Sequence, residues 1–334
     1  MRGRPDEPRP SDDRRNKPGG GSIVALAGGI GAAKFLTGLA GVVDPEQITV
    51  ISNTGDDIEL FGLRICPDID TVMYTLGGVI NPEHGWGLAG DTFESLGWMR
   101  RYAGPQWFNL GDRDLATHLY RTEQLNTGRS LTDVTDEMRG ALGAKSPILP
   151  MTDSYAPTYV QTDEGEMHFQ EYFVRRRCEP RVRALNLSHA AASTPSPAIG
   201  PAIAQARAVI VCPSNPFISI GPILAVPGIR SAIEETEAPV AAISPIVGGR
   251  AIKGPAADML RDMGYQVSPV AVAHLYAGLV DLFVLDNQDA AAANEVQRST
   301  GMRTLVTNTI MTSGEDKQRL AAETIQALGI LTNR

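Results

Sequence analysis

The sequence predicts an α/β protein built on a doubly wound, mostly parallel sheet. The first observation is an apolar, β-branched run at 22–27, which ends in a glycine-rich turn. The second is the order that follows, a helical segment at 32–43 and another apolar run at 47–52. The third is the return of the same alternation between 208 and 329. Parallel strands joined by crossover helices produce this order.

The second half of the chain continues the Rossmann-like pattern. We expect strands at 208–212, 240–244, 281–286 and 303–306, and helices near 228–237, 255–263, 288–299 and 315–329. Each expected strand is short and largely apolar, as the buried strands of a parallel sheet are.

A region of different character separates the two halves, at about 85–190. We expect helices at 91–103, 112–127 and 131–142, with Ser130 and Asp133 as a capping pair for the last. Residues 158–175 alternate and turn like a β-hairpin. We expect this inserted helical and β-hairpin region to cover the carboxyl edge of the sheet, where open α/β sheets bind ligands.

Bulk composition limits the classes of function. With 334 residues, 43% hydrophobic and 20% charged, the chain suits one soluble domain at 22–334. Its formal charge of −8 argues against nucleic-acid binding, and no apolar run approaches the roughly 18 residues of a membrane span. Three dispersed cysteines without a CxxC pair fit a reducing cytoplasm. Residues 1–21, rich in Arg, Asp, Pro and Gly, predict a disordered extension.

Four aspartates follow the second expected strand within fifteen positions: Asp56, Asp57, Asp68 and Asp70. Like charges gathered there repel and raise each other's pKa, and a divalent cation relieves that repulsion. Oxygen ligands without a nearby cysteine or histidine cluster favour Mg²⁺ over zinc. The pattern indicates metal-assisted phosphoryl chemistry. A turn followed by a helix cap, with Asp68 or Asp70 accepting bonds from the first helical amides, explains the same residues.

The turn after the first strand reads Gly28-Gly29-Ile30-Gly31 and opens a helix. Backbone can approach a phosphate closely at such a place, and a helix N-terminus favours anions. The turn is neither a Walker A loop nor a full GxGxxG, because Lys34 stands where the third glycine would be. Lys34 supplies a charge to a phosphate if it faces the turn. A tight strand-to-helix turn is the alternative.

Two further segments are candidates for ligand contacts. Ser214 and Asn215 follow the strand at 208–212, where they can contact a nucleotide or simply form a turn. Asp112 is expected to cap a helix, Arg113 to offer a planar fork to phosphate, and His118 to pair with Asp114 one turn earlier. A capped helix with a surface ion pair explains that segment as well.

Taken together, these segments resemble one family. The order of GGIGAAKFLTGL, CPDIDT, LGDRDLATHL and PSNPFISIGPIL is similar to that of the 2-phospho-L-lactate transferases, the CofD family, and the resemblance runs from Ile23 to the C-terminus. It implies a step in making coenzyme F-420. A phospho-three-carbon acid passes from its guanosine diphosphate-linked donor to the ribityl hydroxyl of the deazaflavin Fo, and GMP leaves. It also implies a Mg²⁺ requirement and a homodimer.

The resemblance implies roles for individual residues. The metal ligands are expected to be Asp56 and Asp70, with Asp57 or Asp68 accepting the ribityl proton. The residues expected at the nucleotide are Gly28, Gly29, Gly31, Lys34, Asn53, Ser214 and Asn215. Those expected at Fo or the acid are Asp68, Asp70, Asn109, Asp112 and Arg113.

Two other functions remain as alternatives. YvcK-like regulatory proteins resemble the family's fold but bind UDP-sugars, although the intact CPDIDT and GDRDLATH segments argue against that function. A nicotinamide-dependent oxidoreductase needs an acidic ribose ligand where Ser52 and Asn53 stand. The three-carbon acid stays open among phospholactate, phosphoenolpyruvate and 3-phosphoglycerate, as does coupling to a guanylyltransferase that makes the donor.

Overall fold

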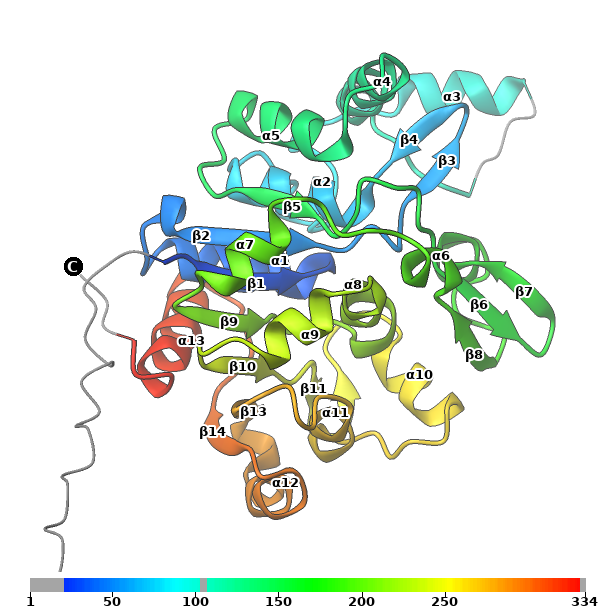
Figure 1. The fold of residues 1–334 in the computed structure, drawn as a ribbon. Coiled ribbons are helices and arrows are strands. Elements are labelled where there is room, and N and C mark those ends of the chain that lie inside the picture. The colour runs from blue at the N-terminus through cyan, green and yellow to red at the C-terminus, as the bar shows by residue number, and fades with distance from the viewer. Residues whose placement is uncertain (1–20, 103–106, 331–334) are drawn as a thin grey trace, which may run out of the picture.

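A seven-stranded parallel sheet forms the centre of the molecule (Figure 1). The computed structural model describes residues 21–102 and 107–330, so the extension expected at 1–21 lies outside the described residues except for Gly21. The strand order is β14-β13-β10-β9-β1-β2-β5. The strands are β1 (Ile23–Ala27), β2 (Ile48–Ser52), β5 (Ile148–Pro150), β9 (Ala208–Val211), β10 (Val240–Ile243), β13 (Leu282–Asp286) and β14 (Arg303–Thr307). The doubly wound α/β prediction is confirmed.

The direction of winding reverses between β1 and β9. From β1 the chain adds β2 and β5 on one side, and later adds β9, β10, β13 and β14 on the other. In such folds a ligand crevice lies beyond the carboxyl ends of the strands at this switch point.

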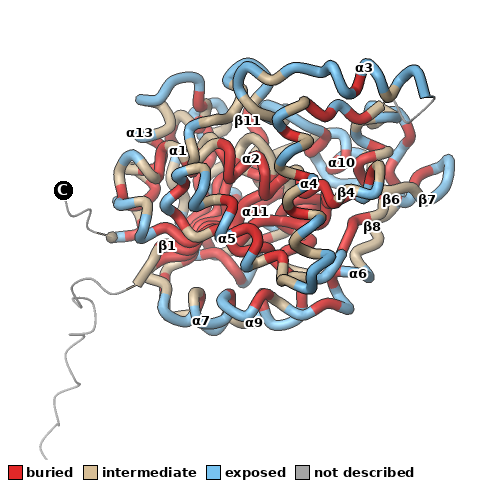
Figure 2. Tube along the Cα trace, turned by 90° about the horizontal axis from the view of Figure 1, so that it is seen from above, coloured by how far each residue is buried: buried red, intermediate tan, exposed pale blue. Residues whose placement is uncertain are grey.

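Helices cover both faces of the sheet, and the alternating side chains of β1 divide between two apolar cores. Ile23, Ala25 and Ala27 pack with residues of α1 (Gly29–Ala40), α2 (Pro67–Leu76), α5 (Leu131–Ala141) and α13 (Gly314–Ala327). Val24 and Leu26 belong to the opposite core, with α7 (Ile199–Ala204), α9 (Ile229–Glu234), α11 (Pro269–Leu275) and α12 (Ala293–Thr300). Figure 2 shows the buried sheet enclosed by half-buried and exposed helices.

The middle region carries the expected helices and hairpin, with two differences. It contains α3 (Glu94–Arg101), α4 (Asp112–Asn126), α5, and a small sheet of β6 (Tyr159–Thr162), β7 (Gly165–His168) and β8 (Val182–Asn186). Ser130 accepts a bond from the Asp133 amide, as expected. One strand of the main sheet, β5, lies inside the range 85–190, and β3 (Ile58–Leu60) pairs with β4 (Leu63–Ile65) just before it.

The second difference concerns the hairpin, whose second strand was expected to reach residue 175. The strand ends at His168, and a π-helical turn follows at Glu171–Arg175. Phe169 and Tyr172 are both buried in the same core, and Phe169 stacks on Phe173. Spacings of three and four place side chains on one face of a helical turn, whereas a strand would alternate them.

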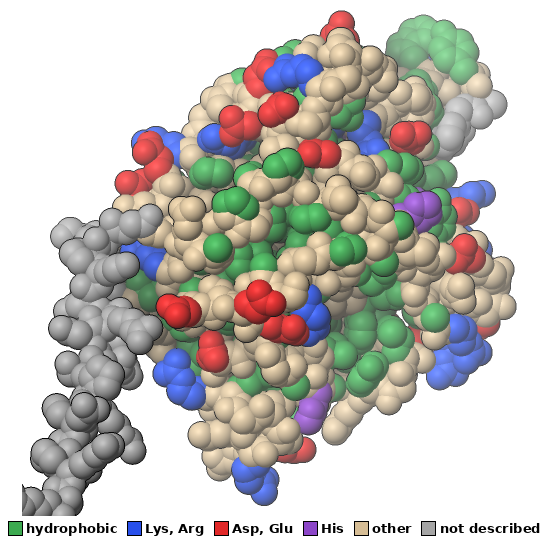
Figure 3. All heavy atoms as spheres, in the orientation of Figure 1, with side chains coloured by type: hydrophobic (Ala, Val, Ile, Leu, Met, Phe, Trp, Pro, Cys, Tyr) green, Lys and Arg blue, Asp and Glu red, His purple; other side chains and the backbone are tan. Residues whose placement is uncertain are grey.

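Short elements complete the chain. They are η2 (Pro45–Gln47), α6 (Ser188–Ala191), η4 (Pro216–Ile220, π-helical), α8 (Gly221–Ala225), β11 (Ile246–Val247), β12 (Arg250–Ala251), α10 (Ala256–Asp262) and η5 (Asn287–Ala292). Within the described ranges, no helix has the length and apolar character to cross a bilayer. On the face drawn in Figure 3, acidic and basic side chains are interspersed rather than gathered in one basic patch.

Candidate functional site

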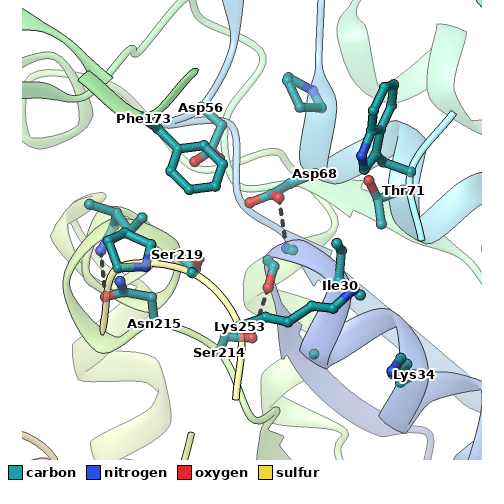
Figure 4. A pocket seen from close by; sticks show the side chains of 18 of the residues that line it. Ile30, Lys34, Asp56, Asp68, Thr71, Phe173, Ser214, Asn215, Ser219 and Lys253 are labelled. Carbon is teal, nitrogen blue, oxygen red and sulfur yellow. Dashed lines mark hydrogen bonds between the residues drawn. The ribbon is translucent and has the colours of Figure 1, made fainter. Parts of the chain in front are cut away.

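A cavity of about 470 Å³ opens at the switch point, within the range of small-molecule sites. Residues that follow β1, β2 and β9 line it together with the middle region (Figure 4). Ten of the residues expected from the sequence lie on its wall: Gly28, Gly29, Gly31, Lys34, Asp56, Asp68, Asp70, Asn109, Ser214 and Asn215.

The glycine turn packs too closely against its neighbours to admit a side chain. A Cβ added at Gly31 would lie 2.2 Å from the carbonyl oxygen of Pro213, and one at Gly28 would lie 2.7 Å from Oδ2 of Asp68. Gly29 has φ +72° and its amide donates to Oδ1 of Asp68 at 2.7 Å. The turn therefore joins the ends of β1 and β9, and one amide of the helix N-terminus already holds a carboxylate.

Asp56 and Asp68 are held by the same side-chain amide. Nδ2 of Asn53 donates to Asp56 Oδ1 at 2.6 Å and to Asp68 Oδ2 at 2.8 Å, and also lies 3.1 Å from the carbonyl oxygen of Ile218. Burial, and then the charge of Asp68, hold the pKa of Asp56 well above its ordinary value. Burial raises the pKa of Asp68 to about 6. Two buried carboxylates on one donor are an arrangement that a cation stabilises.

Asp57 points away from the cavity. Its Oδ2 accepts bonds from Nε and Nη2 of Arg64 at 3.1 and 3.0 Å, and from the Cys66 thiol at 3.1 Å. Burial raises its pKa to about 6, against the opposing effect of Arg64. Asp57 is not among the residues that line the cavity.

Asp70 lines the cavity but already has a cationic partner. Its carboxylate forms a two-pronged ion pair with the fully buried Arg121. Nδ1 of His118 lies 3.7 Å from Oδ2 of Asp70. Nε2 of His118 lies 3.4 Å from Oδ1 of Asp114, which is the pairing expected from the sequence. Tyr74 donates to Asp114 at 2.6 Å. Within this network, Arg121 balances the charge of the Asp70 carboxylate.

The donors fit a magnesium ion in a limited way. In the part of the chain that the structure describes, no group of three or more His, Cys, Asp or Glu side chains is placed to hold a metal. Mg²⁺ is usually bound by one or two carboxylates, with water and substrate phosphate oxygens completing its octahedron. Asp56 and Asp68, both buried, both on the cavity wall and both of raised pKa, suit that role. Asp70 suits it less, because Arg121 occupies its oxygens.

A second lysine, not expected from the sequence, joins Lys34 on the cavity wall. Lys253 follows β12, and Figure 4 shows its side chain extending across the site toward Ile30. Burial, and then the charge of Lys253, lower the pKa of Lys34. Like charges brought together in this way favour an anion between or beside them. The lining of the cavity therefore includes both acidic and basic side chains.

Aromatic rings form another part of the wall. Trp86, Phe108, Phe169 and Phe173 line the cavity, and Phe169 stacks on Phe173 with ring centroids 5.5 Å apart. These rings come from three separate segments, with Phe169 and Phe173 in the same one, so no single sequence motif contains them. They offer a flat apolar surface of the kind that conjugated ring systems stack on.

Besides Asp57, three expected site residues lie outside the cavity lining. Asn53 is completely buried behind the wall, where it holds Asp56 and Asp68. Asp112 does not cap its own helix, for which Gly111 is the N-cap; its carboxylate instead accepts from the amides at the start of α3. Arg113 donates to the carbonyl oxygen of Ala89 at 2.8 Å. Asp112 and Arg113 are outside the cavity lining.

Comparison with known proteins identifies the family. The family model described as "2-phospho-L-lactate transferase CofD" matches residues 23–328. A phosphoenolpyruvate transferase of Streptomyces griseus is 44% identical over 310 residues, covering 91% of this chain and 97% of that protein. One from Kitasatospora aureofaciens is 45% identical, covering 90% and 95%. A 2-phospho-L-lactate transferase of Methanosarcina mazei is 36% identical, covering 91% and 100%.

A solved structure supports the fold independently. A member of the upf0052 family from Bacillus halodurans superposes with a TM-score of 0.60, covering 92% of this chain and 98% of that one. At 16% identity this likeness shows the fold alone. The expectation drawn from the sequence segments is confirmed: the chain belongs to the CofD family of 2-phospho-L-lactate transferases.

Proposed function

We propose that this protein transfers a phospho-three-carbon acid from its guanosine diphosphate-linked donor to the ribityl hydroxyl of the deazaflavin Fo, releasing GMP, in coenzyme F-420 biosynthesis. The observation that carries the proposal is one cavity in which the buried pair Asp56 and Asp68 shares a wall with Lys34, Lys253 and an aromatic surface. A diphosphate, a cation and a flat ring system each find matching chemistry there. The family assignment supports the same reaction class.

The chemical step needs positioning and charge neutralisation more than a covalent nucleophile. The ribityl oxygen bonds to the phosphorus that carries the acid, the bond from that phosphorus to the GMP oxygen breaks, and the hydroxyl proton leaves late to water. Lys34 and Lys253 neutralise charge on the diphosphate oxygens. Asp56 and Asp68 would hold Mg²⁺, which when bound would supply further neutralisation of the leaving GMP.

We infer phosphoenolpyruvate as the acid of this chain. The support is that relatives bearing that name are 44–45% identical in Streptomyces and Kitasatospora, against 34–36% for the 2-phospho-L-lactate transferases of Methanosarcina. Such acids differ by few atoms, and a pocket separates close isosteres by about 1–3 kcal/mol unless a buried polar group loses its partner. The preference is therefore expected to be graded.

A coupled assay read by mass spectrometry tests the proposal. The protein is mixed with Fo, Mg²⁺, GTP, an active guanylyltransferase and phosphoenolpyruvate, 2-phospholactate or 3-phosphoglycerate in turn. We expect a deazaflavin phosphodiester and GMP, most rapidly with phosphoenolpyruvate, and loss of product when Mg²⁺ is chelated. The absence of product from all three acids would reject the transferase.

A matched pair of variants separates the metal assignment from general damage. Asp56→Asn removes a cavity carboxylate, whereas Asp133→Asn changes an exposed aspartate near the start of α5. We expect the first to lose nearly all activity and the second to keep it. If no product forms but UDP-sugars bind the purified protein, the regulatory alternative replaces the transferase.

A further inference from the structure

The acidic loop after β2 is tied to the hairpin of the middle region through three successive backbone carbonyls. The Gly55 carbonyl accepts from the Thr158 amide at 2.7 Å. The Asp56 carbonyl accepts from Nε2 of Gln170 at 3.2 Å, and the Asp57 carbonyl from Nε2 of His168 at 3.0 Å. The two side-chain donors lie 114 and 111 positions away in the sequence. The loop that presents Asp56 is therefore fixed by a distant segment.

These contacts are well defined for side chains. The backbone amide of Gln170 donates to Nδ1 of His168 at 3.0 Å. Nε2 of His168 therefore carries the proton that is donated to the Asp57 carbonyl. Gln170 is 4% exposed and lines the cavity. Gly55 packs so closely that an added Cβ would lie 2.5 Å from Oγ1 of Thr158. Loop and hairpin therefore contact each other directly, through these hydrogen bonds and through the close approach at Gly55.

The same segment also builds the aromatic wall. Directly beyond Gln170, the π-helical turn places Phe173 and Val174 on the cavity. Phe173 stacks on the buried Phe169, yet it is 40% exposed, so one side of its ring is open. Figure 4 shows Phe173 and Asp56 both facing the cavity. Single-turn π-helices recur at functional sites, and here one lies next to the residues that hold the acidic loop.

We propose that Gln170 and His168 are positioning residues. They couple the binding of a planar ligand against Phe173 to the position of the Asp56 carboxylate. The inference rests on the proposed function and deepens it. A planar ligand stacked on Phe173 fixes the π-helical turn, the turn fixes Gln170, and Gln170 fixes the carbonyl of the residue whose carboxylate binds the cation. The acceptor and the metal-bound nucleotide then strengthen each other's binding, and the effect must be reciprocal.

Equilibrium binding of separate ligands tests the coupling without turnover. Fo is titrated into the protein alone and with Mg²⁺ and GDP, following deazaflavin fluorescence; GDP with Mg²⁺ is titrated with and without Fo by calorimetry. We expect each ligand to tighten the other by the same factor, roughly tenfold, within the usual range of such couplings. Independent binding of both ligands by the wild type would overturn this inference and leave the proposed function standing. If Fo does not bind at all, both fail.

Variants test the named residues. Gln170→Leu keeps the bulk and removes the donor, and we expect it to lose most of the tenfold coupling. His168→Gln keeps a donor at similar reach and should retain more coupling than His168→Ala. Gln161→Leu, an exposed glutamine in β6 of the same hairpin, is the matched control and should behave as wild type. Full coupling in a folded Gln170→Leu protein, or its loss in Gln161→Leu, would remove Gln170 from this role.

Discussion

Breaking the pair between Asp70 and Arg121 tests how the charges beneath the cavity are balanced. Arg121 is completely buried and its guanidinium contacts both oxygens of Asp70. Removing one partner leaves an uncompensated buried charge, which costs about 3–5 kcal/mol. We therefore expect Arg121→Met and Asp70→Asn each to lower the free energy of unfolding by about that amount, or the melting temperature by roughly 10 °C.

The double variant carries the decisive information. With both charges removed, Asp70→Asn/Arg121→Met should be far less destabilised than the two single variants added together, because neither charge is left alone. Chemical denaturation of the four proteins measures the coupling, and the Mg²⁺ concentration that gives half-maximal activity is measured alongside. We expect Asp70→Asn to change stability much more than this Mg²⁺ concentration. If Asp70→Asn melts within about 2 °C of wild type and needs tenfold more Mg²⁺, Asp70 is a metal ligand and the neutralisation argument is wrong.

Three further predictions concern the cavity wall. Burial raises the pKa of Asp68 to about 6, above its ordinary value. The contribution of Asp68 to the free energy of unfolding is therefore fully present below its ordinary pKa and is lost as pH rises through about 6. If the ionised pair binds a cation, as proposed, thermal melting should show a larger Mg²⁺ stabilisation at pH 7.5 than at pH 5, and Asp56→Asn should abolish it; an equal increment at both values would contradict this. Gly31→Ala forces a Cβ to within 2.2 Å of the Pro213 carbonyl oxygen and should cost about 1–3 kcal/mol in denaturant unfolding, so a neutral result would contradict the close packing. Lys253→Ala should raise the KM for the donor about tenfold with little change in the KM for Fo, measured by steady-state kinetics; an unchanged donor KM would place Lys253 away from the diphosphate.

The central strands β1, β2, β9, β10 and β13 were predictable because they are buried on both faces. Runs such as 240–243 are apolar throughout and completely buried, so no competing pattern obscures them. The end of the hairpin was not predictable in the same way. Residues after His168 carry apolar side chains that suit either a strand or a helical turn, and only packing of Phe169 and Tyr172 into one core decides between them.

The site was predictable as a cluster but not as a set of orientations. Asp56 and Asp57 are adjacent and chemically identical, yet one faces the cavity and the other Arg64. Asp70 meets Arg121, which is 51 positions away and lies in no motif with it. Lys253 is equally invisible, since its place on the wall depends on the path of the chain after β12. Local patterns locate strand ends, and tertiary contacts decide which side chains remain free there.

The shared amide of Asn53 constrains how this site can change over evolution. Its Nδ2 has two hydrogens and serves two carboxylates from different segments, while its Oδ1 accepts from the Gly55 amide at 2.8 Å. A substitution at any one of positions 53, 56 and 68 therefore differs from a substitution on the surface. It leaves hydrogen-bond donors or acceptors unmatched at the other two positions. These three positions should vary together among relatives or not at all. A lineage that abandons the chemistry of this cavity would be expected to change them as a group.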